Sequence, residues 1–176
     1  MADRSGSRAN RDSAVSPAYL PEHVPAFVRA LEIAEREARA LEASWNGLNQ
    51  MDLGVEQLDH LEPDASLAIS IEAFAARFGR LQDHLGEKLI PRLLLLLGEV
   101  PGPLLDNLNR AERLGILENA LDWLTWRKLR NRLVHEYFQE TAAFAQAIQQ
   151  ALHATPLLLN LLKAIRQRAQ QAQIPI

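Results

Sequence analysis

Residues 67–89 read LAISIEAFAARFGRLQDHLGEKL, and this stretch decides the fold. Its large apolar side chains recur at steps of four and three residues, close to a heptad repeat, which is the spacing of one helical face. The stripe consists of Leu67, Ile71, Phe74, Phe78, Leu81, Leu85 and Leu89. A stripe of this kind packs against antiparallel helices or against a second copy of itself. The segment therefore predicts a protein built on a long amphipathic helix.

Helical spacing continues on both sides of this stretch. A first helix is expected from Glu22 to about Leu48, a short one over about 104–114, another from Glu118, and a last one from Thr141. No segment shows the sustained alternation of a strand. The sequence predicts an all-α fold, an antiparallel up-and-down bundle of four long helices plus short helices.

Two prolines fall inside the expected helices. Proline lacks a backbone donor, and its ring clashes with the carbonyl one turn earlier. Pro91 therefore predicts a kink in the long helix, and Pro156 predicts an interruption of the last helix.

Composition bounds the class of protein. A length of 176 residues fits one domain, and we expect a mobile N-terminal tail over 1–20 and a helical domain over 21–172. The net charge of −3 means that any contact with nucleic acid must come from a local basic patch. The absence of cysteine excludes disulfides and fits a cytoplasmic location. The most apolar run, 89–97, is too short to span a membrane.

One segment carries a chemical argument, RNRLVHEY at residues 130–137. Arginine stays charged and offers a fork of donors to phosphate oxygens, whereas histidine transfers protons near neutral pH. Cleavage of RNA without a metal needs such a cation together with an acid and a base. Arg130 and His135 are the candidate catalytic residues, with Asn131 and Tyr137 in support. Four cations crowd this segment, at Arg127, Lys128, Arg130 and Arg132.

Helical geometry constrains this hypothesis. At about 100° per residue, Arg130 and Tyr137 lie about 20° apart around the axis, but His135 lies about 140° from Arg130. We expect a break in the helix near 133–135, combined with a groove that two copies of the motif line across a two-fold axis.

Each of these features also has a structural interpretation. An Arg and a His on an amphipathic helix can be a solvated or core-satisfying pair, and the cations a solvated helix end. Arg77, Arg80 and Asp83 form either an intrahelical ion-pair ladder or a cleft wall opposite the motif. Trp123 and Trp126 are better explained as core or dimer anchors than as platforms for bases. A pairing of Asp83 with His84 would be a surface feature. The five histidines lack metal-ligand spacing, so neither a metal nor a cofactor is expected.

The motif resembles the signature of the HEPN superfamily. In its HepT-like branch the pattern is arginine, four residues, histidine, any residue and tyrosine, which Arg130, His135 and Tyr137 match, with Asn131 as the polar residue after the arginine. The segments 74–83, 113–117 and 126–129 are also similar to that branch. The resemblance covers roughly residues 25–165.

The resemblance implies a helical homodimer whose two motifs meet in a cleft. Many members are metal-independent ribonuclease toxins, and their partner is a minimal nucleotidyltransferase antitoxin. Carried over to this chain, Arg130 and His135 would be catalytic toward an RNA substrate, Asn131 would support them, and Tyr137 would be the site of AMPylation by the antitoxin. Other members only bind nucleotides or partners. The rivals are thus a non-catalytic HEPN-type subunit of a nucleotidyltransferase and a plain structural helical dimer.

Overall fold

The computed structural model describes residues 18–62, 65–135 and 140–176, with only the backbone described at 134 and 135. Most of the tail expected over 1–20 therefore lies outside the described residues. The described part is all-α and contains no strand. Its elements are a 3-10 turn η1 (Pro21–His23), α1 (Val24–Leu48), α2 (Val55–Asp59), α3 (Ser66–His84), a π-helical turn η2 (Leu85–Leu89), α4 (Ile90–Leu96), α5 (Leu104–Arg113), α6 (Ala120–His135) and α7 (Thr141–Gln171).

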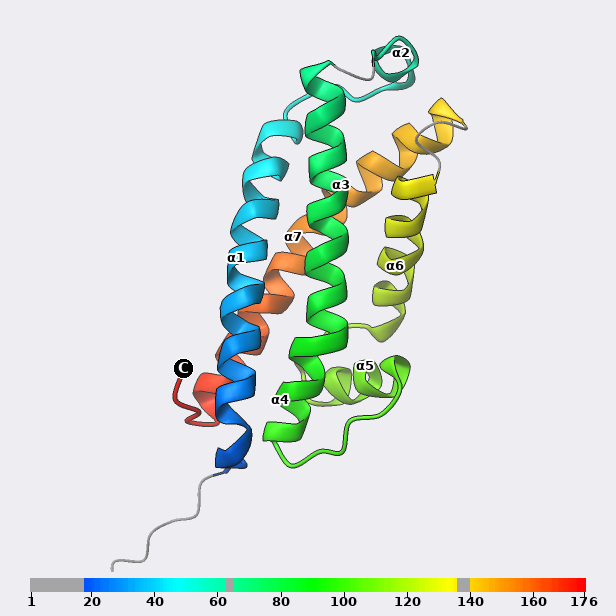
Figure 1. The fold of residues 1–176 in the computed structure, drawn as a ribbon. Coiled ribbons are helices and arrows are strands. Elements are labelled where there is room, and N and C mark those ends of the chain that lie inside the picture. The colour runs from blue at the N-terminus through cyan, green and yellow to red at the C-terminus, as the bar shows by residue number, and fades with distance from the viewer. Residues whose placement is uncertain (1–17, 63–64, 136–139) are drawn as a thin grey trace, which may run out of the picture.

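The long helices run up and down, as the sequence predicts. In Figure 1, α1 ascends, α3 with its continuation α4 descends, α6 ascends, and α7 descends obliquely behind α1 and α3. The short helices lie at the ends of the bundle, α2 at the top and α5 near the bottom. Helix α5 ends next to Gly115, whose φ of 67° provides the left-handed turn that closes a helix C-terminus.

The stripe in the long helix lies in the core of the single chain. From Ile71 to Leu89 its members are fully buried, and only Leu67 is half-buried. They pack in one apolar cluster with residues from α1, α6 and α7. This settles the two alternatives for the stripe: it packs against helices of its own chain, so it is not available to a second copy.

Pro91 is accommodated by a change of helix type. The five-residue π-helical turn η2 directly precedes α4, and Pro91 stands in the first turn of α4, where proline is tolerated. The wider turn interrupts the regular hydrogen-bond ladder at the point where Pro91 lacks its donor. The structure therefore shows a change of helix type next to Pro91, and the kink itself stays a prediction.

The expected interruption at Pro156 does not occur, because α7 is continuous from Thr141 to Gln171. Proline removes the donor that would normally reach the carbonyl of Leu152. The indole N–H of Trp45 on α1 donates to that carbonyl instead, at 2.8 Å, and the Thr155 hydroxyl donates to the carbonyl of Ala151. A tertiary hydrogen bond thus replaces the missing helical one, and the prediction of a broken helix was wrong.

Both ends of the described chain are tied to the bundle. The amide of Leu20 donates to the carbonyl of Leu96 at 2.8 Å. At the other end Ile174 is buried in the core, two residues past the domain end expected at 172. No helix in the described part of the chain has the length and apolarity that crossing a membrane requires.

Candidate functional site

Helix α6 carries the described part of the motif and is anchored by its apolar face. Trp123, Trp126, Leu129 and Leu133 are all buried against the core. The two indole rings pack with centroids 6.0 Å apart at a tilt of 55°. The expectation that the tryptophans are anchors is confirmed, and the anchoring is within the chain's own core. This burial fixes the rotation of α6 and leaves Arg127, Lys128 and Asn131 exposed.

Arg130 crosses from α6 to α3, where a glycine makes room for it. A Cβ atom at Gly79 would stand 3.1 Å from Cγ and 3.3 Å from Nε of Arg130, closer than ordinary van der Waals contact. The aliphatic part of the arginine therefore lies directly over the backbone of α3. Sequence reasoning did not single out Gly79. The available signal is a glycine in the middle of a helix, a position that disfavours glycine unless something approaches closely.

The guanidinium of Arg130 is held on both sides. One nitrogen lies 3.1 Å from a carboxylate oxygen of Asp83, and another donates to Oδ1 of Asn131 at 3.1 Å. The Arg130 side chain is 41% exposed and that of Asp83 40%, so the ion pair contributes at most about 1 kcal/mol. Its main effect is on geometry, because it fixes the direction of a planar donor group that solvent still reaches.

The strip Arg77, Arg80 and Asp83 does not act as a unit. Asp83 faces α6, whereas Arg77 donates to the hydroxyl of Ser44 on α1. Neither arginine is ion-paired with Asp83 among the described residues, so the ladder is not formed there. Asp83 alone fits the interpretation of a wall opposite the motif. Asp83 and His84 do not pair either, because Nε2 of His84 bonds the carbonyl of Ala30 at 2.8 Å.

The four cations of the motif region have different surroundings. Arg127 and Lys128 are exposed. Arg130 is bound to Asp83, and Arg132 reaches α7, donating to the carbonyl of Ala143 at 3.2 Å and to Oε1 of Gln150 at 3.4 Å. The cluster is thus two solvated cations and two that fasten α6 to its neighbours.

Helix α6 shows no break at Leu133 or Val134 and extends to His135, the last residue described before the gap at 136–139. The expected break is thus absent from the backbone up to His135, and the residues that follow lie outside the described part of the chain. On a continuous helix, positions 130 and 135 lie about 140° apart around the axis. The side chain of His135 and the whole of Tyr137 lie outside the described residues. The structure brings Arg130 and Asn131 together and adds Asp83 and Gly79 to them.

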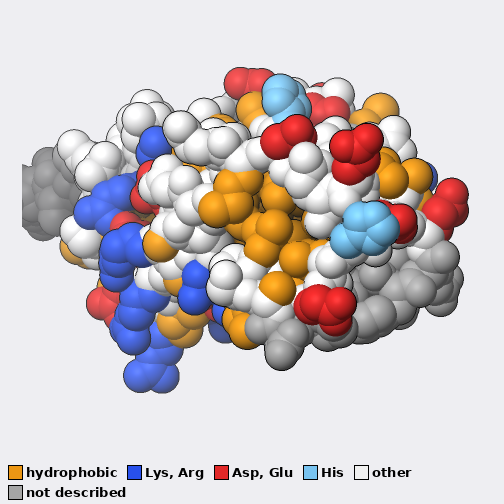
Figure 2. Space-filling model, turned by 90° about the horizontal axis from the view of Figure 1, so that it is seen from above, with side chains coloured by type: hydrophobic (Ala, Val, Ile, Leu, Met, Phe, Trp, Pro, Cys, Tyr) orange, Lys and Arg blue, Asp and Glu red, His pale blue; other side chains and the backbone are white. Residues whose placement is uncertain are grey.

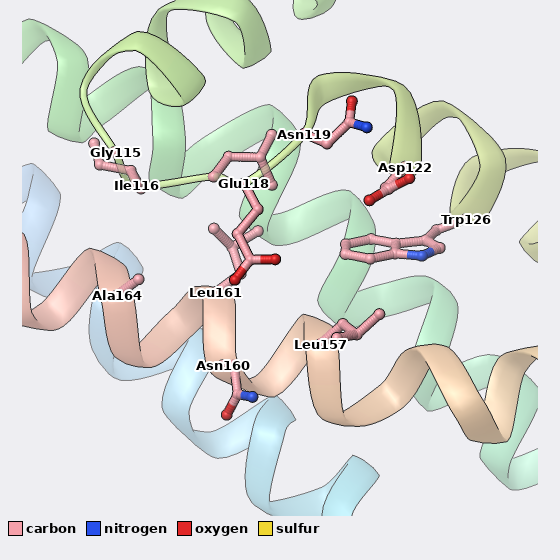
Figure 3. A pocket seen from close by; sticks show the side chains of 11 residues that line it. Gly115, Ile116, Glu118, Asn119, Asp122, Trp126, Leu157, Asn160, Leu161 and Ala164 are labelled. Atoms are coloured by element: carbon pink, nitrogen blue, oxygen red, sulfur yellow. The ribbon is translucent and has the colours of Figure 1, made fainter.

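A separate pocket opens between the α5–α6 loop and α7. It has a volume of about 180 Å³ and is lined by Trp126 together with Glu118, Asp122, Asn119 and Asn160. Figure 3 shows Asp122 close above the Trp126 ring, while Glu118 extends from the loop toward α7. Two carboxylates repel phosphate, so this pocket does not suit a nucleic-acid backbone. Among the described residues no group of three or more acidic or histidine side chains could hold a metal ion.

Comparison with protein-family models, with curated proteins and with solved structures finds no match to this chain.

Proposed function

We propose that this chain is a HepT-like, metal-independent endoribonuclease of the HEPN type, the toxin of a toxin–antitoxin pair. The observation that carries the proposal is Arg130, placed over Gly79 and directed by Asp83 and Asn131 while its guanidinium stays accessible. A phosphate needs such a preoriented fork of donors. The arginine begins the sequence pattern that places His135 and Tyr137 further along the chain.

The chemistry divides between two residues. Arg130 would offset the charge that develops on the phosphodiester, and His135 would transfer the proton of the 2′-hydroxyl or of the leaving oxygen. Because positions 130 and 135 diverge around α6, one copy does not present both on one face. A homodimer in which α6 of each copy lines a shared groove supplies both from opposite sides. Its interface would involve the exposed face of α6, since the stripe of α3 is buried.

The partner would be a minimal nucleotidyltransferase antitoxin that adds AMP to Tyr137. The added phosphate would compete with RNA for the cations of the motif, so that charge and bulk inhibit together. Tyr137→Phe should keep most of the cleavage activity and escape this silencing. Intact-mass spectrometry after incubation with the partner and ATP tests it: the wild type should gain the mass of AMP and Tyr137→Phe should not. Equal modification of both proteins would place the site elsewhere.

The second candidate function is a non-catalytic subunit that binds RNA or a nucleotidyltransferase. The ion pair between Arg130 and Asp83 favours it, because the carboxylate offsets charge that a phosphate would otherwise meet. An assay for cleavage of total RNA in the presence of EDTA distinguishes the ribonuclease from the non-catalytic subunit. We expect cleavage by the wild type and a loss of about 100-fold or more in Arg130→Ala and His135→Ala.

Arg39→Ala is the matched control, because it removes an exposed cation from α1, outside the motif helix and its proposed groove. It should cleave like the wild type. Full activity in either Arg130→Ala or His135→Ala overturns the catalytic assignment, whereas RNA binding without cleavage by the wild type assigns the chain to the binding class.

A further inference from the structure

A second surface cavity lies on the other side of α3, between the first half of α1 and the segment η2–α4. Its volume of about 660 Å³ falls in the range of sites for small organic molecules. Its walls come from α1 through Arg29 and Ile33, and from the long helical run through His84, Lys88 and Arg92. Gly79 and Asp83 face α6, whereas His84 bonds to α1. The cavity is therefore separate from the motif and does not depend on the proposed function.

The lining of this cavity is strongly basic. It contains Arg29, His84, Lys88 and Arg92 and no carboxylate, although the whole chain is acidic with a net charge of −3. Basic side chains are unevenly spread over the molecule as a whole: in the view from above in Figure 2, most of the visible Lys and Arg side chains lie on the left. Within the described ranges, the side chains of Arg29 and Lys88 make no hydrogen bond or ion pair, and Arg92 donates only to the carbonyl of Lys88, at 3.2 Å. No described carboxylate therefore forms an ion pair with these three cations.

The histidine in the wall is held in a fixed orientation. Its Nε2 donates to the backbone carbonyl of Ala30 at 2.8 Å, because a carbonyl only accepts. The ring is thus an immobile part of the wall, whereas the three longer side chains reach the cavity on flexible stems. The floor is apolar and consists of Pro25, Ala26, Ala30 and Ile33, of which Ile33 is 37% exposed.

We propose that this cavity binds a small organic phosphate, a phosphate monoester whose apolar body lies on Pro25, Ala26 and Ile33. Several cations around one space, with no ion-pair partner among the described residues, suit a group with about two negative charges and several acceptor oxygens. Inorganic phosphate has no apolar part that could pack on the floor of the cavity. An uncharged molecule would leave the cations unpaired. Arg29, Lys88 and Arg92 hold the phosphate, and the floor selects for the body attached to it.

Isothermal titration calorimetry with the full chain at low salt tests both halves of the proposal. Phenyl phosphate should bind once per chain, about tenfold or more tighter than inorganic phosphate, while phenol should show no binding. Ile33→Ser should lower the affinity for phenyl phosphate and leave the weak affinity for inorganic phosphate unchanged. Inorganic phosphate that binds as tightly as phenyl phosphate removes the role of the apolar floor.

The charge requirement is tested with a matched pair of double variants. Lys88→Gln with Arg92→Gln should reduce phenyl phosphate affinity about tenfold or more. Arg36→Gln with Arg39→Gln removes the same charge from exposed positions of α1 outside the cavity, and should have no such effect. Equal losses in both double variants would show that only net charge matters. Phenyl phosphate that does not bind would overturn the proposal. If a short RNA binds instead, and its affinity falls in the Lys88→Gln, Arg92→Gln variant, the surface is assigned to nucleic acid.

Discussion

Arg130 shows how one glycine can set the direction of a charged side chain. The guanidinium reaches Asp83 only because the aliphatic stem passes within van der Waals distance of the α3 backbone at Gly79. Any side chain at position 79 occupies the path of the arginine. The pairing itself joins residues 47 positions apart, so neither helical periodicity nor local charge pattern predicts it. The sequence pattern placed Asp83 on the long helix, but it did not identify Arg130 as the residue that pairs with it.

Gly79→Ala should therefore move Arg130 with little effect on stability. The atoms nearest the added methyl group belong to a flexible arginine, and alanine favours a helix by about 0.5–1 kcal/mol over glycine. We expect the Nε–H NMR resonance of Arg130, assigned by its loss in Arg130→Lys, to shift and to exchange faster with water. Gly47→Ala on α1, where nothing lies within 4 Å of the new Cβ, is the control. An unchanged resonance would show that α3 does not orient the arginine.

Glu37 gives the molecule a pH dependence with a defined sign. Burial raises the pKa of its carboxyl above the ordinary value of 4.5, against the opposing effects of His84 and Arg80, and its Oε2 is buried without a hydrogen-bond partner among the described residues. The folded state thus holds this proton more tightly than the unfolded state. Stability falls as pH rises from about 4.5 through the raised pKa, and the penalty persists above it.

Glu37→Gln should remove this slope and raise the free energy of unfolding at neutral pH relative to acidic pH. Urea unfolding measured at intervals from pH 4 to 8 gives the comparison. Glu42→Gln, an exposed position on the same helix, should keep the wild-type slope. If Glu37→Gln and wild type stay parallel across this range, burial of the carboxyl does not govern the pH dependence.

At the scale of elements, α7 shows what the local rules of helix formation miss. Pro156 has no backbone N–H to donate to the carbonyl of Leu152, and yet α7 is continuous. What keeps the helix continuous is Trp45, which belongs to α1 and reaches the orphaned carbonyl only in the folded bundle. A sequence pattern predicts helices from their own residues, so a compensation supplied by another helix is invisible to it. The buried stripe of α3, by contrast, was predictable because its spacing alone defines a face.

The compensation can be measured with a double-mutant cycle. Trp45→Phe should destabilise the protein by about 1–2 kcal/mol through the unpaired carbonyl, in addition to a smaller packing term. In a Pro156→Ala background the alanine N–H takes over the bond to Leu152, so Trp45→Phe should be less damaging there. The coupling energy from chemical unfolding should be about 1 kcal/mol. Additive effects of the two substitutions would exclude the compensation.

At the scale of the whole molecule, periodicity was sufficient to predict the class of fold and the up-and-down arrangement. It was not sufficient for the surfaces, because the same apolar stripe fits a core and a dimer interface equally well. Only the packing of α1, α6 and α7 over α3 distinguishes them. The basic cavity was also beyond prediction, since Arg29 and Lys88 come from segments far apart in the chain.

If the proposed groove between two motifs exists, the protein is a homodimer that associates through α6. Light scattering at micromolar concentration should then give twice the chain mass of 19.7 kDa. Leu121, which is 66% exposed on α6, is a sensitive position, and Leu121→Glu should shift the population toward monomer while the far-UV circular dichroism stays unchanged. A monomeric wild type would remove the shared groove.

The hydrogen bond between Trp45 and Leu152 also constrains the order in which the helices of the chain can pack during synthesis. Its two partners are separated by 107 positions, and α1 leaves the ribosome long before its acceptor is made. Helices α1 and α3 can associate early, yet the indole N–H finds its carbonyl only once the middle of α7 has emerged. Contacts of such long sequence separation slow folding, because loop closure precedes any gain. Helix α1 therefore makes this contact only after most of α7 has been synthesised.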